Sequence, residues 1–483
     1  MNRRMILYIM GMLLLSEAGL MILPVMVDLY YREGKFNCYL ITIFALLVSG
    51  LFMISLKPKN KTIHARDGFV IVSFGWILVS LFGALPFFLS GEIPNYLDAV
   101  FETVSGFTTT GASILSDVEA LCHANLFWRS FTHWIGGMGV LVFIMAVLPL
   151  AGGGGDLHLM RAESPGPDVG KLVPKSLSTA RILYGIYLAL TLIEIILLLI
   201  GGMPLFESIT HTFGTAGTGG FGVKNSSIGE YSSYIQYVIA VFMTLFGINF
   251  NLYFLLLCGK IKDVLKSEEL RAYLLIMFTA VLVITVDVND FFATGAESFR
   301  HAFFQVSSVM TTTGFSTTDF DQWPDLSKVI LLIVMCIGAC AGSTGGGVKV
   351  SRIILVFKNA RRELKRLLHP RSVNVVTFDG KRVTDDVMQG TSVYMCLYFV
   401  ILAVSVLLVS FDSVDIVSNF TGVISTLNNI GPGLGAVGPT GNFGVYGWFS
   451  KCVFIIDMLF GRLEIFPLLL LFSKKPKSRK NTL

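Results

Sequence analysis

The chain has 483 residues, of which 53% are hydrophobic and only 14% are charged, and its mean hydropathy is +0.71. These values exclude an ordinary soluble globular domain and predict a membrane protein with many spans. The formal net charge of +5 requires no nucleic-acid partner, because the basic residues gather in segments between the apolar runs.

Apolar segments of about 20 residues are long enough to cross the roughly 30 Å hydrocarbon layer of a membrane. The first follows Arg3 and Arg4 and continues to Met26 without a cleavage site, so we expect a retained helix rather than a secretory signal. In chain order the sequence predicts ten spans, at 5–30, 37–56, 68–90, 127–150, 181–202, 233–258, 270–292, 326–341 with a broken continuation to 366, 391–411 and 443–472.

Lys and Arg are concentrated in alternate segments between these spans. Cytoplasmic segments of membrane proteins are enriched in Lys and Arg, so the distribution predicts that both termini lie in the cytoplasm. The segments expected on the inside are 1–4, 57–67, 156–181, 260–271, 347–382 and 474–483.

Two stretches with nearly the same letters interrupt the apolar runs, FTTTGAS at 107–113 and MTTTGFS at 310–316. Two weaker relatives, TAGTGGFG at 215–222 and NNIGPGLG at 428–435, complete a fourfold pattern. A long apolar span begins at a similar distance before each stretch. The expected equivalent glycines are Gly111, Gly220, Gly314 and Gly433.

A short apolar segment precedes each stretch, as at 96–107 and 296–310, and is too short to cross a bilayer. We therefore expect an all-α polytopic fold, with four membrane helix–re-entrant pore loop–membrane helix units behind an N-terminal helix pair. The third unit also carries a glycine-rich break and a basic arm. The expected divisions are 1–60 for the helix pair and 61–155, 156–262, 263–384 and 385–483 for the four units.

Four such loops are expected to surround one pore, because irregular backbone at membrane depth is tolerated where it lines a water-filled cavity. Inward carbonyl oxygens replace the water shell of a cation, and glycine permits the backbone angles that this requires. The loops contain no carboxylate, which favours a monovalent over a divalent cation. The expected ion-binding residues are Thr109, Thr110, Gly111, Thr218, Gly219, Gly220, Thr312, Thr313, Gly314, Gly431, Pro432 and Gly433.

Over essentially its whole length the chain resembles the bacterial Trk/Ktr/HKT potassium-transporter superfamily, especially its TrkH/TrkG-type membrane subunits. The motifs that carry the resemblance are VSGFTTTGAS, RSFTHWIGGMGVLVF, GTAGTGGFG, SSVMTTTGFSTTDFDQWP, CAGSTGGGVKVSR and LNNIGPGLG. The resemblance implies potassium at the four loops, uptake across the bacterial inner membrane, a homodimer with one pathway per chain, and a cytosolic TrkA-type subunit. Any nucleotide, ATP/ADP or NAD, would bind to that subunit.

The span after the third loop carries CIGACAGSTGGGVKVSR at 336–352. Each interior glycine disfavours a helix by about 1 kcal/mol, so we expect Gly345–Gly347 to unwind it. The resemblance implies that this segment is an intramembrane gating loop, whereas close helix packing is the alternative. A nucleotide-binding P-loop is disfavoured, because Val348 stands where that motif requires Lys. The expected gate residues are Gly342, Ser343, Thr344, Gly345, Gly346, Gly347, Lys349 and Arg462.

Arg462 lies near the centre of the last predicted span, where an arginine requires a polar partner. Asp457 and Glu464 do not have the three- or four-residue spacing that brings side chains together on one helix. We therefore expect Arg462 to contact the gating loop or a pore-loop carbonyl and to raise an electrostatic barrier to cations. A salt bridge between helices is the alternative.

The basic stretch at 358–371 is followed by a predicted hairpin at 373–386, and we favour docking of a cytosolic partner there, with membrane lipid as the alternative. The sequence shows no catalytic dyad, metal cluster or nucleotide fingerprint of an enzyme. It predicts gated, passive conduction of potassium with modest selectivity. Proton- or sodium-coupled symport is the alternative, with the candidate coupling residues Glu17, Glu194 and Asp287.

Overall fold

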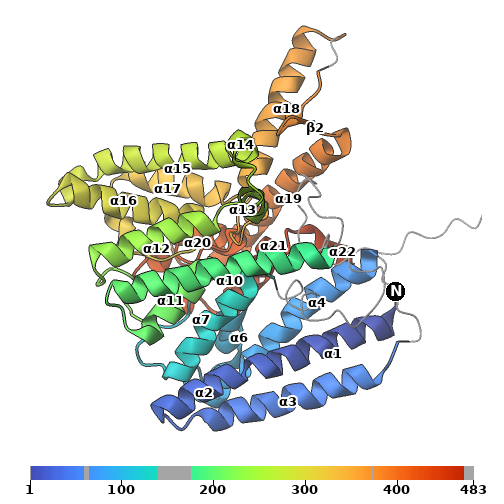
Figure 1. Cartoon of the computed structure of the whole chain (residues 1–483), viewed down its shortest axis with the longest axis vertical. Coiled ribbons are helices and arrows are strands. Elements are labelled where there is room, and N and C mark those ends of the chain that lie inside the picture. Colours follow the sequence, from blue (N-terminus) through green and yellow to red (C-terminus); the bar gives the residue numbers. More distant parts are fainter. Residues whose placement is uncertain (1, 59–64, 140–175, 372–373, 473–483) are drawn as a thin grey trace, which may run out of the picture.

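The computed structural model describes residues 2–58, 65–139, 176–371 and 374–472. Long helices lie side by side through the body of the molecule (Figure 1). Six of the described helices are long and apolar enough to cross a membrane, or seven if one bent pair counts as a span. The expected spans, inside segments and hairpin that fall partly or wholly outside the described residues are 1–4, 57–67, 127–150, 156–181, 347–382, 373–386 and 474–483.

An N-terminal pair of helices lies at one edge of the molecule (Figure 1). α1 (Arg3–Leu20) continues into α2 (Ile22–Tyr31), and α3 (Phe36–Ser55) returns beside α1. Two glycines bring these helices together, because a Cβ on Gly11 would lie 2.7 Å from the carbonyl oxygen of Gly50. The predicted pair of N-terminal spans is therefore present.

After this pair, a long helix, a short helix and a second helix recur four times. The long helices are α4 (Ala65–Gly83), α10 (Ser176–Ile200), α15 (Glu268–Asp287) and α19 (Asp385–Val409). The short helices are α6 (Tyr96–Phe107), α11 (Leu205–Gly217), α16 (Gly295–Met310) and α20 (Ile416–Asn428). The second helices are α7 (His123–Gly137), α12 (Ser233–Phe246), α17 (Asp325–Ile337) and α21 (Trp448–Arg462). The remaining elements are α5 (Leu85–Leu89), α13 (Phe250–Leu257), α14 (Ile261–Lys266), α18 (Val350–Leu368), α22 (Phe466–Phe472) and short 3-10 turns at Asn289–Phe291, Phe320–Gln322, Ser410–Asp412, Gly435–Val437 and Phe443–Val445.

The short helices have 12 to 16 residues, which corresponds to about 18–24 Å and is less than the thickness of the hydrocarbon layer. Most of their side chains are buried, so they lie inside the protein rather than on its surface. The expected short helices at 96–107 and 296–310 are confirmed.

Two spans that were expected to be continuous are broken, so that part of the prediction was wrong. α12 and α13 meet at an angle of 91°. The carbonyl of Gly247 and the N–H of Phe250 leave the helical pattern and bond to the segment that follows α17. α21 also ends before α22, because Glu464 and Ile465 have positive φ and Pro467 has no N–H to continue the helix.

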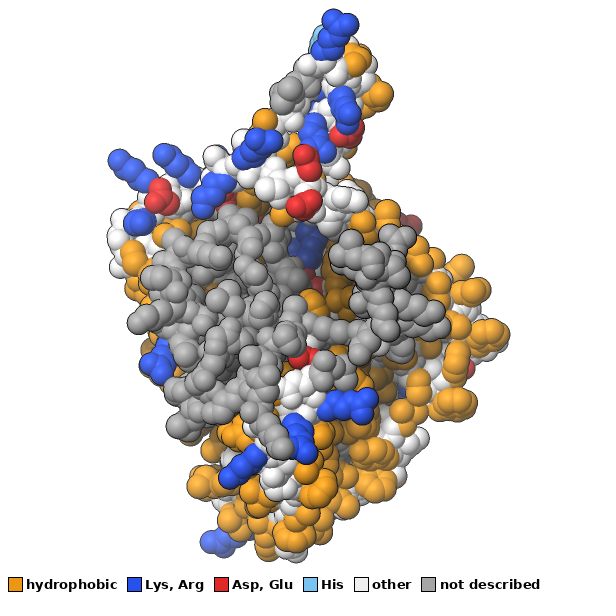
Figure 2. Space-filling model, turned by 90° about the vertical axis from the view of Figure 1, so that its right-hand side faces the viewer, with side chains coloured by type: hydrophobic (Ala, Val, Ile, Leu, Met, Phe, Trp, Pro, Cys, Tyr) orange, Lys and Arg blue, Asp and Glu red, His pale blue; other side chains and the backbone are white. Residues whose placement is uncertain are grey.

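The expected glycine-rich break is present between α17 and α18, where residues 338–349 form no helix. α18 then projects away from the body (Figure 1). β1 (Thr377–Phe378) and β2 (Lys381–Arg382) form an antiparallel hairpin in the region expected for one. Figure 2 shows Lys and Arg side chains along α18 and over the adjoining face, and hydrophobic side chains on the flank of the body.

The contact between Gly11 and Gly50 generates a prediction about helix packing. Gly11→Ala is expected to lower the free energy of unfolding by about 1–3 kcal/mol, because the new methyl group overlaps the backbone of α3. Thermal unfolding of the detergent-solubilised protein measures this change. The control is Gly19→Ala on the same helix, where no atom lies within 4 Å of the new Cβ. A loss of stability in the control as large as that of Gly11→Ala would contradict the packing argument.

Candidate functional site: a ring of four loops above an unwound segment

Each short helix ends in the same backbone pattern. One residue at the end of each short helix adopts a left-handed conformation. The residue that follows it donates its backbone N–H to the carbonyl of the residue five positions before it in the chain. The left-handed residues are Thr109, Thr218, Thr312 and Asn429, with φ of 55°, 54°, 60° and 56°. The backbone bonds that follow are Thr110 to Ser105, Gly219 to Gly214, Thr313 to Ser308 and Ile430 to Ser425, at 2.8–2.9 Å.

A glycine with positive φ follows two residues after each left-handed position. These glycines are Gly111, Gly220, Gly314 and Gly431, with φ of 79°, 76°, 88° and 106°. The expected equivalence of Gly433 was therefore wrong by two residues. Its N–H bonds to the carbonyl of Val437 at 2.7 Å, outside the shared pattern.

The four glycines close a ring, because each one lies against the carbonyl of the next loop. A Cβ on Gly111 would overlap the carbonyl oxygen of Gly219, and one on Gly220 would overlap that of Thr313. The same overlap joins Gly314 to Ile430, and a Cβ on Gly431 would lie 3.0 Å from the oxygen of Thr110. The four carbonyls belong to equivalent positions, each directly before its loop's glycine. No side chain larger than a hydrogen fits between neighbouring loops at Gly111, Gly220 and Gly314, and a methyl group at Gly431 would make a tight contact.

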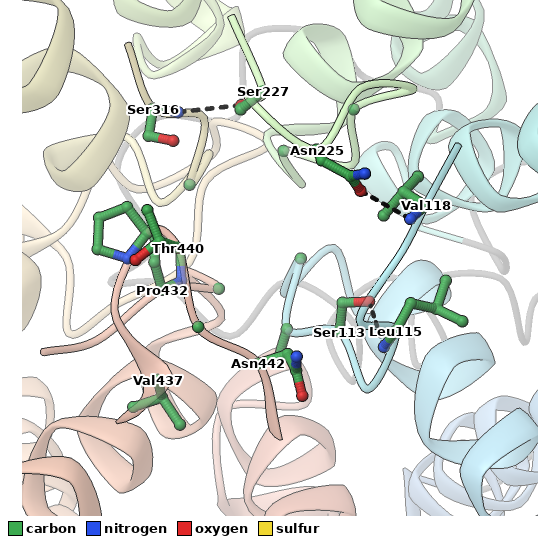
Figure 3. A pocket seen from close by; sticks show the side chains of 18 of the residues that line it. Ser113, Leu115, Val118, Asn225, Ser227, Ser316, Pro432, Val437, Thr440 and Asn442 are labelled. Carbon is green, nitrogen blue, oxygen red and sulfur yellow. Dashed lines mark hydrogen bonds between the residues drawn. The ribbon is translucent and has the colours of Figure 1, made fainter. Parts of the chain in front are cut away.

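Hydrogen bonds between residues that follow these glycines in the chain join the loops in the same cyclic order. They run from Val118 N to Asn225 Oδ1 (2.8 Å), from Ile228 N to Ser316 O (2.9 Å), from Gly435 N to Asp321 Oδ1 (3.2 Å) and from Phe443 N to Ser113 O (2.8 Å). A pocket opens between the four loops, and its lining includes residues of all of them (Figure 3).

The described residues that line this pocket include two cationic side chains and no carboxylate. Arg129 is held by Glu102 at 2.6 Å and by the carbonyl of Gly222 at 3.0 Å. Lys224 lies 3.5 Å from Glu230 and 4.7 Å from the ring centre of Tyr231. Both positively charged side chains therefore have partners that hold them at the wall of the pocket.

Buried polar residues brace the loops from behind, and the sequence analysis did not identify their roles. Glu102, buried with Arg129, also accepts hydrogen bonds from Ser113 Oγ at 3.0 Å and Ile114 N at 3.1 Å. His133 Nδ1 donates to the carbonyl of Gly106 at 2.8 Å, and its ring fills the space beside Gly219. The signal that could have found them is the presence of polar side chains within apolar helices.

Asn429 connects the fourth loop to the first. Its amide donates to Thr110 Oγ1 and to the carbonyl of Met458, both at 2.9 Å. The sequence analysis placed Asn429 inside the fourth motif but gave it no role.

The unwound segment lies directly against the third and fourth loops. Gly346 N donates to Thr312 Oγ1 at 2.6 Å, and Gly347 N donates to the carbonyl of Asn428 at 3.0 Å. Thr344 Oγ1 donates to the carbonyl of Phe246 at 3.2 Å, at the bend after α12. The Lys349 ammonium donates to the carbonyl of Gly345 within the segment. Gly342 and Ser343 lie at its outer end, where the carbonyl of Gly342 accepts from Phe250 N and Ser343 Oγ donates to the carbonyl of Cys340.

Arg462 joins the unwound segment to the first loop. Its guanidinium donates to Thr344 O at 3.0 Å and to Thr109 Oγ1 at 3.2 Å. It also donates to the carbonyls of Gly136 and Gly137 at the end of α7. The expected contact with the glycine-rich segment is confirmed. Glu464 forms an ion pair with Arg352, and Asp457 accepts a hydrogen bond from Ser405 Oγ.

The site residues predicted from sequence therefore fall into two adjoining groups. Those of the first three loops, together with Gly431, form the ring, and those at 342–349 form the segment beneath it. Pro432 lines the pocket and its ring lies 3.0 Å from a Cβ placed on Gly314, whereas Gly433 lies behind it.

Residues 34–483 match the family model TrkH, described as a cation transport protein. The chain is 40% identical over 481 residues to the Trk system potassium uptake protein TrkH of Escherichia coli (strain K12), covering 98% of this chain and 99% of that protein. It is 36% identical over 476 residues to the Trk system potassium uptake protein TrkG of the same organism, covering 97% and 98%. The crystal structure of the potassium transporter TrkH from Vibrio parahaemolyticus is similar, with a TM-score of 0.88, 36% identity and coverage of 98% and 99%.

The contacts of Arg462 predict that it stabilises the native structure. Arg462→Gln is expected to lower the free energy of unfolding by about 2–3 kcal/mol, because buried carbonyls lose a charged donor. Arg462→Lys should recover little of the lost stability, since one ammonium lacks the planar set of donors of a guanidinium. Thermal unfolding in detergent measures both variants, with Arg361→Gln on the exposed face of α18 as the control. Unchanged stability of Arg462→Gln would contradict this role.

Proposed function

This chain belongs to the TrkH family of cation transport proteins, and we propose that it conducts potassium into the bacterial cell through the ring of four loops. It is a membrane protein of the Trk potassium uptake system rather than an enzyme. In this proposal the pathway is channel-like, and potassium moves passively down its electrochemical gradient when the pathway is open.

The ring of equivalent carbonyls is the observation that carries the proposal. Thr110, Gly219, Thr313 and Ile430 supply one carbonyl each, and each carbonyl lies beside the glycine of the neighbouring loop. Neutral oxygen ligands of this kind replace the hydration shell of a monovalent cation. Among the described residues, the pocket lining contains no carboxylate, which disfavours a divalent cation. Because the loops share one equivalent glycine each rather than a longer filter, we propose modest discrimination among potassium, rubidium and sodium.

We propose that the four repeats form four pore units around this ring, divided at 61–155, 156–262, 263–384 and 385–483, with residues 1–60 as an accessory helix pair. The chain then has ten crossings of the bacterial inner membrane and both termini in the cytoplasm. The partners are a second copy of the chain, with separate pathways, and a cytosolic TrkA-type subunit that binds the nucleotide. The basic arm that begins with α18 is the proposed docking site for that subunit.

The unwound segment is the proposed gate. It contacts the third and fourth loops directly through Gly346 and Gly347, and Arg462 joins it to the first loop. A segment in this position blocks the pathway beneath the ring. Its glycines remove the side chains that would resist movement, and the positive charge of Arg462 adds an electrostatic barrier to cations.

Coupled symport remains the second candidate function, and two buried glutamates favour it. Both carboxyl oxygens of Glu17 and of Glu194 are buried without a hydrogen-bond partner among the described residues. Such groups are candidate proton carriers. Asp287 does not share this property, because it accepts hydrogen bonds from the backbone N and the hydroxyl of Ser327 at 3.1 and 2.5 Å.

The ring predicts that Gly220→Ala abolishes potassium uptake, because the new methyl group overlaps the carbonyl oxygen of Thr313. Growth of a potassium-uptake-deficient bacterium at low potassium measures the effect, together with rubidium uptake. Gly202→Ala is the matched control. Gly202 also has positive φ, at 84°, but no atom lies within 4 Å of its Cβ position. Wild-type uptake by a normally expressed Gly220→Ala protein would exclude the ring as the pathway.

Passive conduction predicts rubidium flux into liposomes that contain the protein but have no proton or sodium gradient. Glu17→Gln and Glu194→Gln are expected to retain this flux, because an uncharged amide replaces a group that conduction does not require. Flux that appears only with an imposed proton gradient, and disappears in either variant, would establish symport instead.

A further inference from the structure

Two adjacent glutamates at the start of α15 contact two different parts of the third unit. Glu269 is 5% exposed, and its Oε1 accepts from the N–H of Ala341 at 2.7 Å and from the N–H of Ser351 at 3.1 Å. Ala341 precedes the three consecutive glycines of the unwound segment, and Ser351 follows them in the first turn of α18. One carboxylate oxygen therefore fastens both ends of the segment to α15.

The start of α18 depends on this carboxylate. The first N–H groups of a helix have no partner within the helix. Here the N–H of Lys349 bonds to Ile337 O at 3.0 Å and that of Val350 bonds to Ala339 O at 3.1 Å, whereas Ser351 relies on Glu269. A negative charge at this position also interacts favourably with the helix dipole.

The backbone of the segment is strained as well as tethered. Lys349 has φ of 80° and ψ of 135°, a conformation that residues with a side chain rarely adopt. Strain of this kind persists only where the surrounding contacts enforce it, and it is found at switch segments. The segment is therefore expected to leave this conformation when its tethers are removed.

Glu268 contacts the cytoplasmic side of the same unit. Its carboxylate forms an ion pair with Lys358 of α18, whose ammonium also donates to the carbonyl of Thr377 in the hairpin at 2.6 Å. The backbone N–H of Glu268 donates to Asp379 Oδ1, at the hairpin turn, at 2.7 Å. The arm and the unwound segment are thus fastened to consecutive residues of α15.

We propose that Glu268 and Glu269 form a latch that couples the position of the cytoplasmic arm to the unwound segment. Glu269 is the positioning residue that holds the segment in its blocking conformation. Glu268 fastens the arm to the same turn of α15. A displacement of α18 or of the hairpin therefore strains the contacts of Glu268 and those of Glu269 together. This inference rests on the proposed function of the segment as a gate, and it names the contacts by which a movement outside the membrane releases it.

The test substitutes Glu269, which holds the unwound segment, and measures the opening of the proposed gate in two ways. Glu269→Leu leaves two backbone N–H groups without their acceptor in the blocking conformation, so it is expected to raise rubidium flux in liposomes without any cytosolic partner by roughly 5- to 30-fold. The second measurement is the rate at which a soluble maleimide modifies Cys340, quantified by mass spectrometry. Cys340 is fully buried within the segment, and exposed Cys258 serves as the internal reference. In Glu269→Leu, the modification of Cys340 is expected to become faster in proportion to the increase in rubidium flux.

Three further variants complete the test. Glu269→Gln retains an acceptor oxygen and should restore most of the wild-type behaviour, and it also serves if the leucine variant fails to fold. Lys358→Met removes the ion pair with Glu268. It is expected to change flux and Cys340 modification in the same direction as Glu269→Leu. Asp263→Asn, on the exposed surface of α14, is the matched control and should change neither.

The outcomes separate the latch from the gate itself. A variant that lacks Gly345–Gly347 should conduct freely if the segment is the gate. If this deletion raises flux while Glu269→Leu changes neither flux nor Cys340 modification, the latch is wrong and the gate stands. If the deletion leaves the flux of a folded protein unchanged, the proposed gate itself is wrong.

Discussion

The structure depends on the need to satisfy backbone polar groups that leave regular helices inside the protein. Four loops, a bend and an unwound segment all place N–H and carbonyl groups in the protein interior, and each finds partners in another irregular segment. Gly247 O accepts from Cys340 N, Phe250 N donates to Gly342 O, and Gly347 N donates to Asn428 O. The irregular segments therefore stabilise one another, and none of them is an independent insertion.

This mutual dependence explains why glycine recurs at the contacts. Around the ring, a carbonyl of the next loop occupies the Cβ position of Gly111, Gly220 and Gly314 and lies 3.0 Å from that of Gly431. In the unwound segment, a Cβ on Gly346 would overlap the carbonyl of Asn428, and one on Gly345 would lie 2.8 Å from that of Thr311. The backbone of the unwound segment can approach the loops this closely only where side chains are absent.

The sequence was sufficient to locate the short helices, the four loops and the break, because each interrupts an apolar run. It could not fix the register of the fourth loop, where Gly431 and Gly433 flank a proline and both fit the motif. The left-handed conformation of Asn429 and the positive φ of Gly431 identify Gly431 as the equivalent residue. The bend before Phe250 was also missed, since a single glycine precedes it and its hydrogen bonds come from residues about 90 positions away. Partners so distant leave no local pattern.

Arg462 shows how one charged residue can belong to both parts of the site. Its guanidinium donates to a hydroxyl of the first loop and to carbonyls of α7 and the unwound segment, and all of these acceptors are neutral. These neutral acceptors orient the guanidinium without themselves cancelling its positive charge. In the proposed pathway, a cation that descends from the ring approaches this like charge in surroundings of low dielectric constant, where repulsion is stronger than in water. Because Thr344 holds that charge on the proposed gate, movement of the segment changes the physical obstruction and the electrostatic barrier at the same time.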